Sequence, residues 1–142
     1  MLKTNTEIII QSLGGAETVT GSKHLLRTPE KVVLVDCGLF QGLKELRLRN
    51  WAQLPVDPAG IEVLILTHAH LDHCGYIPLL VKNGFRGKIY MTPPTRDLAV
   101  LILNDSAKIQ EEDAERANRG KYSKHEPALP LYSLEDAERS FS

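Results

Sequence analysis

Short apolar runs separated by turn-forming residues dominate the first two thirds of the chain, a pattern typical of β-strands. Runs at 8–13, 23–27, 32–35, 61–66 and 88–91 predict five strands. The turn-forming residues at 28–31 predict a hairpin between the second and third runs. The third run is continuously apolar, which predicts burial on both of its faces.

Helical patterns appear between and after the later strands. Residues 74–83 predict a helix with Pro78 in its first turn, where a missing N–H costs no intrahelical bond. A long helix is expected at about 95–118, apolar and buried at its start, charged and solvated at its end. Ser133, followed by acidic residues, predicts the N-cap of a last helix. Residues 43–51 fit either a short helix or a covering loop.

The order strand–loop–helix–strand across 61–91 favours parallel pairing, so the expected fold class is α/β with a mixed β-sheet and flanking helices. At 142 residues, with 42% hydrophobic and 25% charged residues, the chain has the composition of one globular domain.

Composition and charge indicate the cellular compartment of the protein but do not indicate a binding partner. No apolar run approaches the roughly 20 residues that cross a bilayer, and residues 1–5 begin no signal peptide. The two cysteines, Cys37 and Cys74, form no Cys-x-x-Cys pair, which favours a reduced, cytoplasmic protein. The formal net charge of −1 gives no electrostatic indication of nucleic acid. The basic residues within 43–51 are better explained as a solvated face than as a phosphate site.

Four side chains of metal-ligand type crowd into six residues directly after the fourth apolar run: His68, His70, Asp72 and His73. Imidazole nitrogens and a carboxylate suit zinc. Two residues apart at a strand end, His68 and His70 face the same way, and Asp72 and His73 are expected in a tight loop aimed at a neighbouring point. Two metals about 3.5–4 Å apart would suit this arrangement.

Other residues of ligand type are explained more simply. His24 in a strand and His125 in a Lys-rich connection are better interpreted as structural or solvated. Cys74 is expected to be a small buried residue. Asp36 ends the third apolar run, where a carboxylate can hold a metal-binding histidine in place or can cap a turn. The small polar loop at 16–22 could approach an anion, but a plain connection between strands is favoured.

The segment His-Ala-His-Leu-Asp-His at 68–73 resembles the metal-binding motif of the metallo-β-lactamase superfamily, which implies an αββα hydrolase fold. Gly-Gly-Ala-Glu-Thr-Val-Thr-Gly-Ser at 14–22 and Val-Asp-Cys-Gly-Leu-Phe-Gln-Gly at 35–42 resemble the start of its β-CASP RNA-processing nucleases. That resemblance favours the histidine-orienting interpretation of Asp36. It also implies that His68 and His70 hold one zinc ion and that Asp72 and His73 hold the other, with Asp72 also acting on the attacking water.

The resemblance further implies that later ligands are missing, two histidines and an aspartate among them, as is the β-CASP cap domain. Residues 1–142 are therefore expected to be the N-terminal part of an RNA-cleaving metallo-β-lactamase domain, half of its sandwich, with substrate-binding residues unknown. Such a part alone is expected to be inactive and to pair with itself or with a missing C-terminal half. The alternatives are a small hydrolase of thioesters or lactones and a non-catalytic partner-binding domain.

Overall fold

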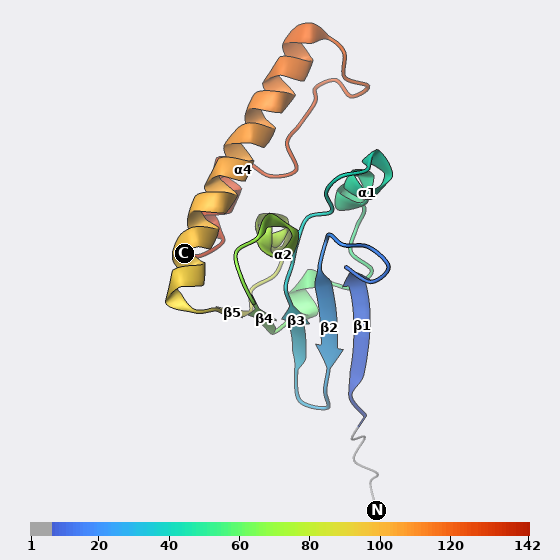
Figure 1. Ribbon diagram of the computed structural model, residues 1–142, viewed down its shortest axis with the longest axis vertical. Coiled ribbons are helices and arrows are strands. Elements are labelled where there is room, and N and C mark those ends of the chain that lie inside the picture. Colours follow the sequence, from blue (N-terminus) through green and yellow to red (C-terminus); the bar gives the residue numbers. More distant parts are fainter. Residues whose placement is uncertain (1–6) are drawn as a thin grey trace, which may run out of the picture.

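The computed structural model describes residues 7–142, and the expectation about a signal peptide at 1–5 lies outside them. One mixed five-stranded sheet forms the centre of the molecule, with the strands side by side in chain order (Figure 1). The first three strands pair antiparallel and the last two join in parallel. The strands are β1 (Ile9–Gly14), β2 (Lys23–Arg27), β3 (Val32–Val35), β4 (Val63–Ile65) and β5 (Lys88–Tyr90). This arrangement confirms the expected α/β class and parallel unit.

Helices and single turns occupy the connections and the second half of the chain. In Figure 1 the long helix α4 crosses the molecule diagonally and extends beyond the sheet. Within residues 7–142, no helix is both long enough and apolar enough to cross a membrane. The bounds are α1 (Lys44–Leu48), two 3-10 turns (Arg49–Trp51 and Pro58–Gly60), α2 (Leu71–Cys74), α3 (Ile77–Lys82), α4 (Pro93–Gly120) and α5 (Leu134–Arg139).

Several predicted helix signals are confirmed. Residues 43–51 contain a short helix rather than only a loop, and Pro78 lies in the first turn of α3. The long helix α4 begins at Pro93, two residues before its predicted start, and the Thr92 side chain, which was not predicted as a cap, accepts a hydrogen bond from the Thr95 amide. Ser133 caps α5 in a reciprocal capping box with Asp136.

The single helix predicted at 74–83 is wrong, because the structure has two helices, α2 and α3, separated at Gly75 and Tyr76. The carbonyl of Asp72, which would accept from Tyr76 in a continuous helix, accepts from the Ser22 amide at 2.9 Å. The Tyr76 amide instead donates to the Cys37 carbonyl, also at 2.9 Å. Contacts with Ser22 and Cys37 therefore interrupt the helix. The sequence of residues 74–83 alone does not predict these contacts.

One face of the sheet carries the core. Leu25, Leu34 and Leu64 lie in register on neighbouring strands, and each is fully buried. Alternate residues of a strand point to opposite faces, so this row defines the covered face. Helical residues complete the same cluster: Cys74, Ile77, Leu80, Ala99, Leu103, Ala107 and Ala137.

The opposite face of the sheet is open. Ile10 is 74% exposed, Ile65 is 42% exposed and Tyr90 is 54% exposed. The predicted burial of β3 on both faces is therefore wrong, since only Leu34 in that strand is fully buried. The predicted burial at the start of α4 holds for one stripe, which contains Ala99, while Leu98 and Leu101 face solvent.

A buried lysine, Lys23, lies between two aromatic rings under the 14–22 loop. Its side chain is only 1% exposed, and its Nζ lies 4.5 Å from the centroid of the Phe40 ring and 4.7 Å from that of Tyr76. The rings favour the cation, but burial favours the neutral amine and lowers the Lys23 pKa to about 8. A cation in this position therefore lowers the stability of the fold at neutral pH.

We expect Lys23 to contribute an increase of about 1 kcal/mol to the free energy of unfolding between about pH 8 and pH 9. In the unfolded chain this lysine has its ordinary pKa of 10.5. The unfolded chain therefore binds more protons than the folded chain in this window, so stability increases with pH. The Cys37 and Cys74 thiols oppose this contribution in the same window, because burial raises their pKa to about 12 and the folded chain keeps protons that the unfolded chain loses. Urea unfolding at both pH values therefore compares variants: the change in free energy from about pH 8 to pH 9 should be about 1 kcal/mol less favourable in Lys23→Met than in the parent chain. The exposed control Lys108→Met should change as the parent does, and an equal change in Lys23→Met and the parent contradicts the assignment.

Candidate metal centre

The histidine-rich segment lies at the carboxyl ends of two parallel neighbours in the sheet, β3 and β4. Asp36 directly follows β3, while Leu66 and Thr67 follow β4. The segment then turns into α2, which sits above these strand ends in Figure 1. Asp72 and His73 belong to the first turn of α2 rather than to the tight loop predicted for them. The edge of the sheet thus brings the carboxylate from one strand against the histidines that follow the other.

Asp36 is the buried centre of a hydrogen-bond network. It is 4% exposed and has a backbone φ of +57°, a left-handed conformation that aspartate tolerates better than most residues. Its Oδ1 accepts from the Thr67 amide at 2.8 Å, and its Oδ2 accepts from the Thr67 hydroxyl at 2.8 Å. The same Oδ2 lies 2.8 Å from His73 Nδ1. Asp36 therefore contacts the histidine segment directly, as expected of a carboxylate that orients a histidine.

These contacts fix how the protons are placed on two histidines. An ionised carboxylate only accepts hydrogen bonds, so His73 Nδ1 must donate to Asp36. The Thr67 hydroxyl has a single hydrogen, which goes to Asp36, and its oxygen then accepts from His68 Nδ1 at 2.9 Å. Both neutral imidazoles consequently carry their proton on Nδ1. Their Nε2 lone pairs remain free, as a metal ligand requires.

The remaining predicted ligands lie beside these two rings. The His68 ring centroid is 4.1 Å from that of His73 and 4.7 Å from that of His70. Asp72 Oδ2 lies 3.5 Å from His73 Nε2. Among residues 7–142, no three His, Cys, Asp or Glu side chains converge closely enough to hold a metal ion together. The structure thus brings the four predicted ligands into one cluster, and their division between two metals stays a prediction.

The chemistry of this cluster fits zinc. Its donors are neutral imidazole nitrogens and a carboxylate oxygen, the atoms zinc takes alongside thiolates. The two Nε2 atoms freed by the Asp36 network lie on rings in contact with each other. Both cysteines are buried, and the Cys74 Sγ donates to the Ala69 carbonyl, so neither is counted among these donors.

Backbone hydrogen bonds from residues 22 and 37–39 also hold α2 in place beside the cluster. The Cys37 amide donates to the His73 carbonyl at 2.7 Å, and the Leu39 amide donates to the Leu71 carbonyl at 3.1 Å. Between them, a Cβ on Gly38 would lie 1.6 Å from the Asp72 carbonyl oxygen, so no other residue fits without moving α2. The Ser22 amide donates to that same oxygen. The 14–22 loop is thus more than a plain connection, because Ser22 at its end binds the backbone of the candidate ligand segment.

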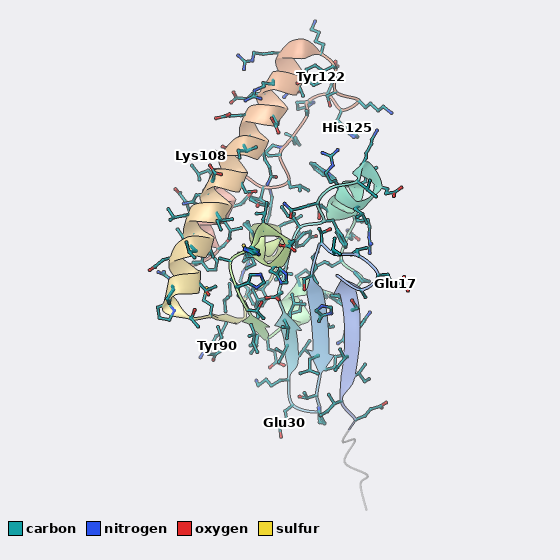
Figure 2. All side chains as sticks on the ribbon, in the orientation of Figure 1. Glu17, Glu30, Tyr90, Lys108, Tyr122 and His125 are labelled. Atoms are coloured by element: carbon teal, nitrogen blue, oxygen red, sulfur yellow. The ribbon has the colours of Figure 1, made fainter. Side chains whose placement is uncertain are left out.

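Sequence reasoning missed two positioning residues, Thr67 and Gly38. Thr67 adjoins the histidine motif, but its hydrogen bonds to Asp36 depend on the distance between two strand ends. Gly38 is visible only as part of Asp-Cys-Gly. The two other histidines lie elsewhere, as expected: His24 is on β2, and Figure 2 shows His125 on the connection that turns back after α4.

Comparison with known proteins identifies the family and several relatives of the chain. Residues 20–127 match the family model of the metallo-beta-lactamase superfamily. Ribonuclease TTHA0252 of Thermus thermophilus is 45% identical over 103 residues, which cover 72% of this chain and 23% of that protein. Transcription termination factor FttA of Methanosarcina mazei is 42% identical over 109 residues, 75% of this chain and 17% of that protein. The chain thus spans about a fifth of the length of these curated relatives.

Among solved structures, a subclass B3 metallo-beta-lactamase of Bradyrhizobium japonicum superposes with a TM-score of 0.44 at 20% sequence identity. The superposition covers 93% of this chain and 46% of that chain.

Replacing Asp36 by Asn tests its orienting role. The asparagine side chain would offer an NH₂ donor where two donors now meet a carboxylate, so His68 and His73 would lose their fixed tautomer. We expect zinc affinity to fall by about 10–100-fold, the usual effect of such a change. Competition against a chromophoric chelator measures the affinity. Asp57→Asn, a cap exposed elsewhere on the chain, is the matched control, and equal affinities in the two variants would reduce Asp36 to a turn residue.

Proposed function

The chain belongs to the metallo-beta-lactamase superfamily, and we propose that it forms the N-terminal part of a zinc-dependent phosphodiester hydrolase that acts on RNA. Its membership confirms the prediction made from the motif at 68–73. The observation that carries the proposal is the Asp36–Thr67–histidine network, because it leaves two imidazole Nε2 atoms free as ligands. The choice of RNA is supported by relatives whose names are ribonuclease and transcription termination factor.

Each residue of the cluster takes one role in this proposal. His68 and His70 would hold one zinc ion, and Asp72 with His73 would hold the second. Zinc, when bound, acts as a Lewis acid that makes water a better nucleophile and polarises a phosphate oxygen. Asp36 and Thr67 keep His68 and His73 in the tautomer that binds through Nε2. A carboxylate oxygen of Asp72 would take a proton from the attacking water.

We propose that residues 1–142 supply only half of the complete site. Two protein ligands per zinc are one fewer than catalytic zinc sites commonly have. The open sheet face, with Ile10 and Ile65 exposed, supports the same view, because a sandwich fold covers such a face with a second layer. In the complete protein, that layer would come from a C-terminal half. In this chain alone, a second copy would be the alternative partner.

Metal binding should depend on the paired histidines. The double variant His68→Ala/His70→Ala removes both ligands proposed for one ion, so we expect its zinc stoichiometry to fall by about one ion per chain. Elemental analysis after dialysis against buffered zinc measures the stoichiometry, and circular dichroism checks the fold. His24→Ala/His125→Ala is the matched control and should retain the zinc of the parent chain. Unchanged zinc in a folded His68→Ala/His70→Ala chain would sink the ligand assignment.

This chain alone should not turn over RNA at the rate of a complete enzyme. Fewer ligands per zinc leave each ion weakly held and open to solvent. The test incubates the purified chain with single-stranded RNA and added Zn²⁺ or Mn²⁺, with Asp72→Ala as the control. Metal-dependent cleavage that Asp72→Ala abolishes would show that this half is sufficient. A longer form of the protein that hydrolyses a thioester or lactone, but not RNA, would overturn the choice of substrate.

A further inference from the structure

Asn50 is a buried amide that takes no part in the Asp36 network. It lies in the 3-10 turn Arg49–Trp51 and is only 4% exposed. Figure 1 shows α1, which this turn directly follows, at the same end of the sheet as α2. The Asn50 Oδ1 accepts from the Phe40 amide at 2.9 Å, and its Nδ2 donates to the Phe40 carbonyl at 2.8 Å. Asn50 thus holds the backbone of Phe40 with the pair of bonds that a neighbouring strand would supply.

The Phe40 ring is held from the same turn and packs against the 14–22 loop. The guanidinium carbon of Arg49 lies 4.1 Å from the ring centroid, and Phe40 is only 5% exposed. A Cβ on Gly21 would lie 2.5 Å from one ring carbon, and a Cβ on Gly14 would lie 2.9 Å from another. The ring therefore rests directly on the backbone of the loop, so the position of the loop depends on the position of the ring.

Both backbone supports of α2 end at Phe40. One support comes from the 14–22 loop, because the Ser22 amide donates to the Asp72 carbonyl at 2.9 Å. The other is the backbone of residues 37–39, which continues directly into Phe40. The first support reaches Phe40 through the packing of its ring, and the second reaches it through the chain. Both supports therefore depend on the residue that Asn50 holds.

We propose that Asn50 is a positioning residue for Asp72 and His73 in α2, and that it acts through Phe40. Both side-chain hydrogen bonds of Asn50 go to Phe40, so its effect on the candidate ligands passes through that residue. Without Asn50, the amide and carbonyl of Phe40 would be buried without partners, which favours a shift of Phe40 and of both supports. The inference rests on the proposed function only where Asp72 and His73 are taken as metal ligands.

Hydrogen exchange of the Ser22 amide in the metal-free chain measures one of these supports directly. Asn50→Ala should accelerate this exchange about tenfold relative to the protected amides of β2 and β3, because the change loosens the loop locally. Zinc affinity, measured by competition against a chelator, should fall about tenfold, the lower limit for a residue that holds a ligand directly.

Asn118→Ala is the matched control. Asn118 holds Ala128 by the same pair of bonds, at 2.7 and 3.0 Å, near the end of α4. It should leave both Ser22 exchange and zinc affinity as they are in the parent chain. Equal acceleration at Ser22 and in β2 and β3 would overturn the inference, since Asn50 would then support the fold in general. Unchanged affinity of Asn50→Ala, where the parent binds zinc, would also overturn it.

Asn50→Asp provides a second test, which also decides the question if Asn50→Ala does not fold. An ionised carboxylate accepts from the Phe40 amide but cannot donate to the Phe40 carbonyl, whereas a protonated carboxyl can do both. Ser22 exchange should therefore be faster than in the parent chain while this carboxyl is ionised, and should match the parent at the same pH once it is protonated. The ¹³C chemical shift of the carboxyl reports its ionisation. Acceleration that is the same in both ionisation states would contradict the inference.

The inference and the proposed function fail separately. If Asn50→Ala loosens Ser22 but no form of the protein binds zinc, the proposed function fails and Asn50 still positions α2. If the parent chain binds zinc and Asn50→Ala leaves Ser22 protected, the inference fails alone.

Discussion

The buried carboxylate of Asp36 is the contact on which the rest of this site depends. A carboxylate removed from water is costly unless its oxygens find donors, and here they find the Thr67 amide, the Thr67 hydroxyl and His73 Nδ1. The hydrogen bonds that the Asp36 carboxylate accepts therefore connect the end of β3, the end of β4 and the first turn of α2. The left-handed backbone at Asp36 is the strained conformation that makes this junction possible.

The proposed metal chemistry and the interrupted helix have the same origin. The backbone of residues 37–39 pairs with α2, and the Ser22 amide takes the Asp72 carbonyl that a longer helix would have used. Asp72 and His73 lie in the single turn of α2, and its backbone pairing with residues 37–39 holds that turn beside the strand ends. Gly38 permits this close approach because it has no side chain. Backbone contacts from Ser22 and from residues 37–39 thus hold the candidate ligands of α2 in place.

Most of the fold could be predicted from the sequence, because its signals are local. Apolar runs bounded by turn residues marked all five strands, and Ser133 marked the start of α5. What could not be predicted depends on distant contacts: the division of 74–83 into two helices, the roles of Thr67 and Gly38, and the exposure of Leu98. The exposure of one sheet face was also not predicted, because an apolar run such as 32–35 does not indicate whether one or both faces of its strand are covered. At the candidate site, residue types and spacing indicated the four candidate ligands as a group, but not their tautomers.

The tautomer of His73 is the most direct measure of whether Asp36 organises this site. Long-range ¹H–¹⁵N NMR of the metal-free chain at about pH 8, where a free imidazole is neutral, distinguishes the two ring nitrogens. We expect a protonated Nδ1 and an unprotonated Nε2 on His73, with this preference lost in Asp36→Asn. A His73 ring that carries its proton on Nε2 would contradict the account, because its lone pair would then face Asp36 and no ligand atom would be free.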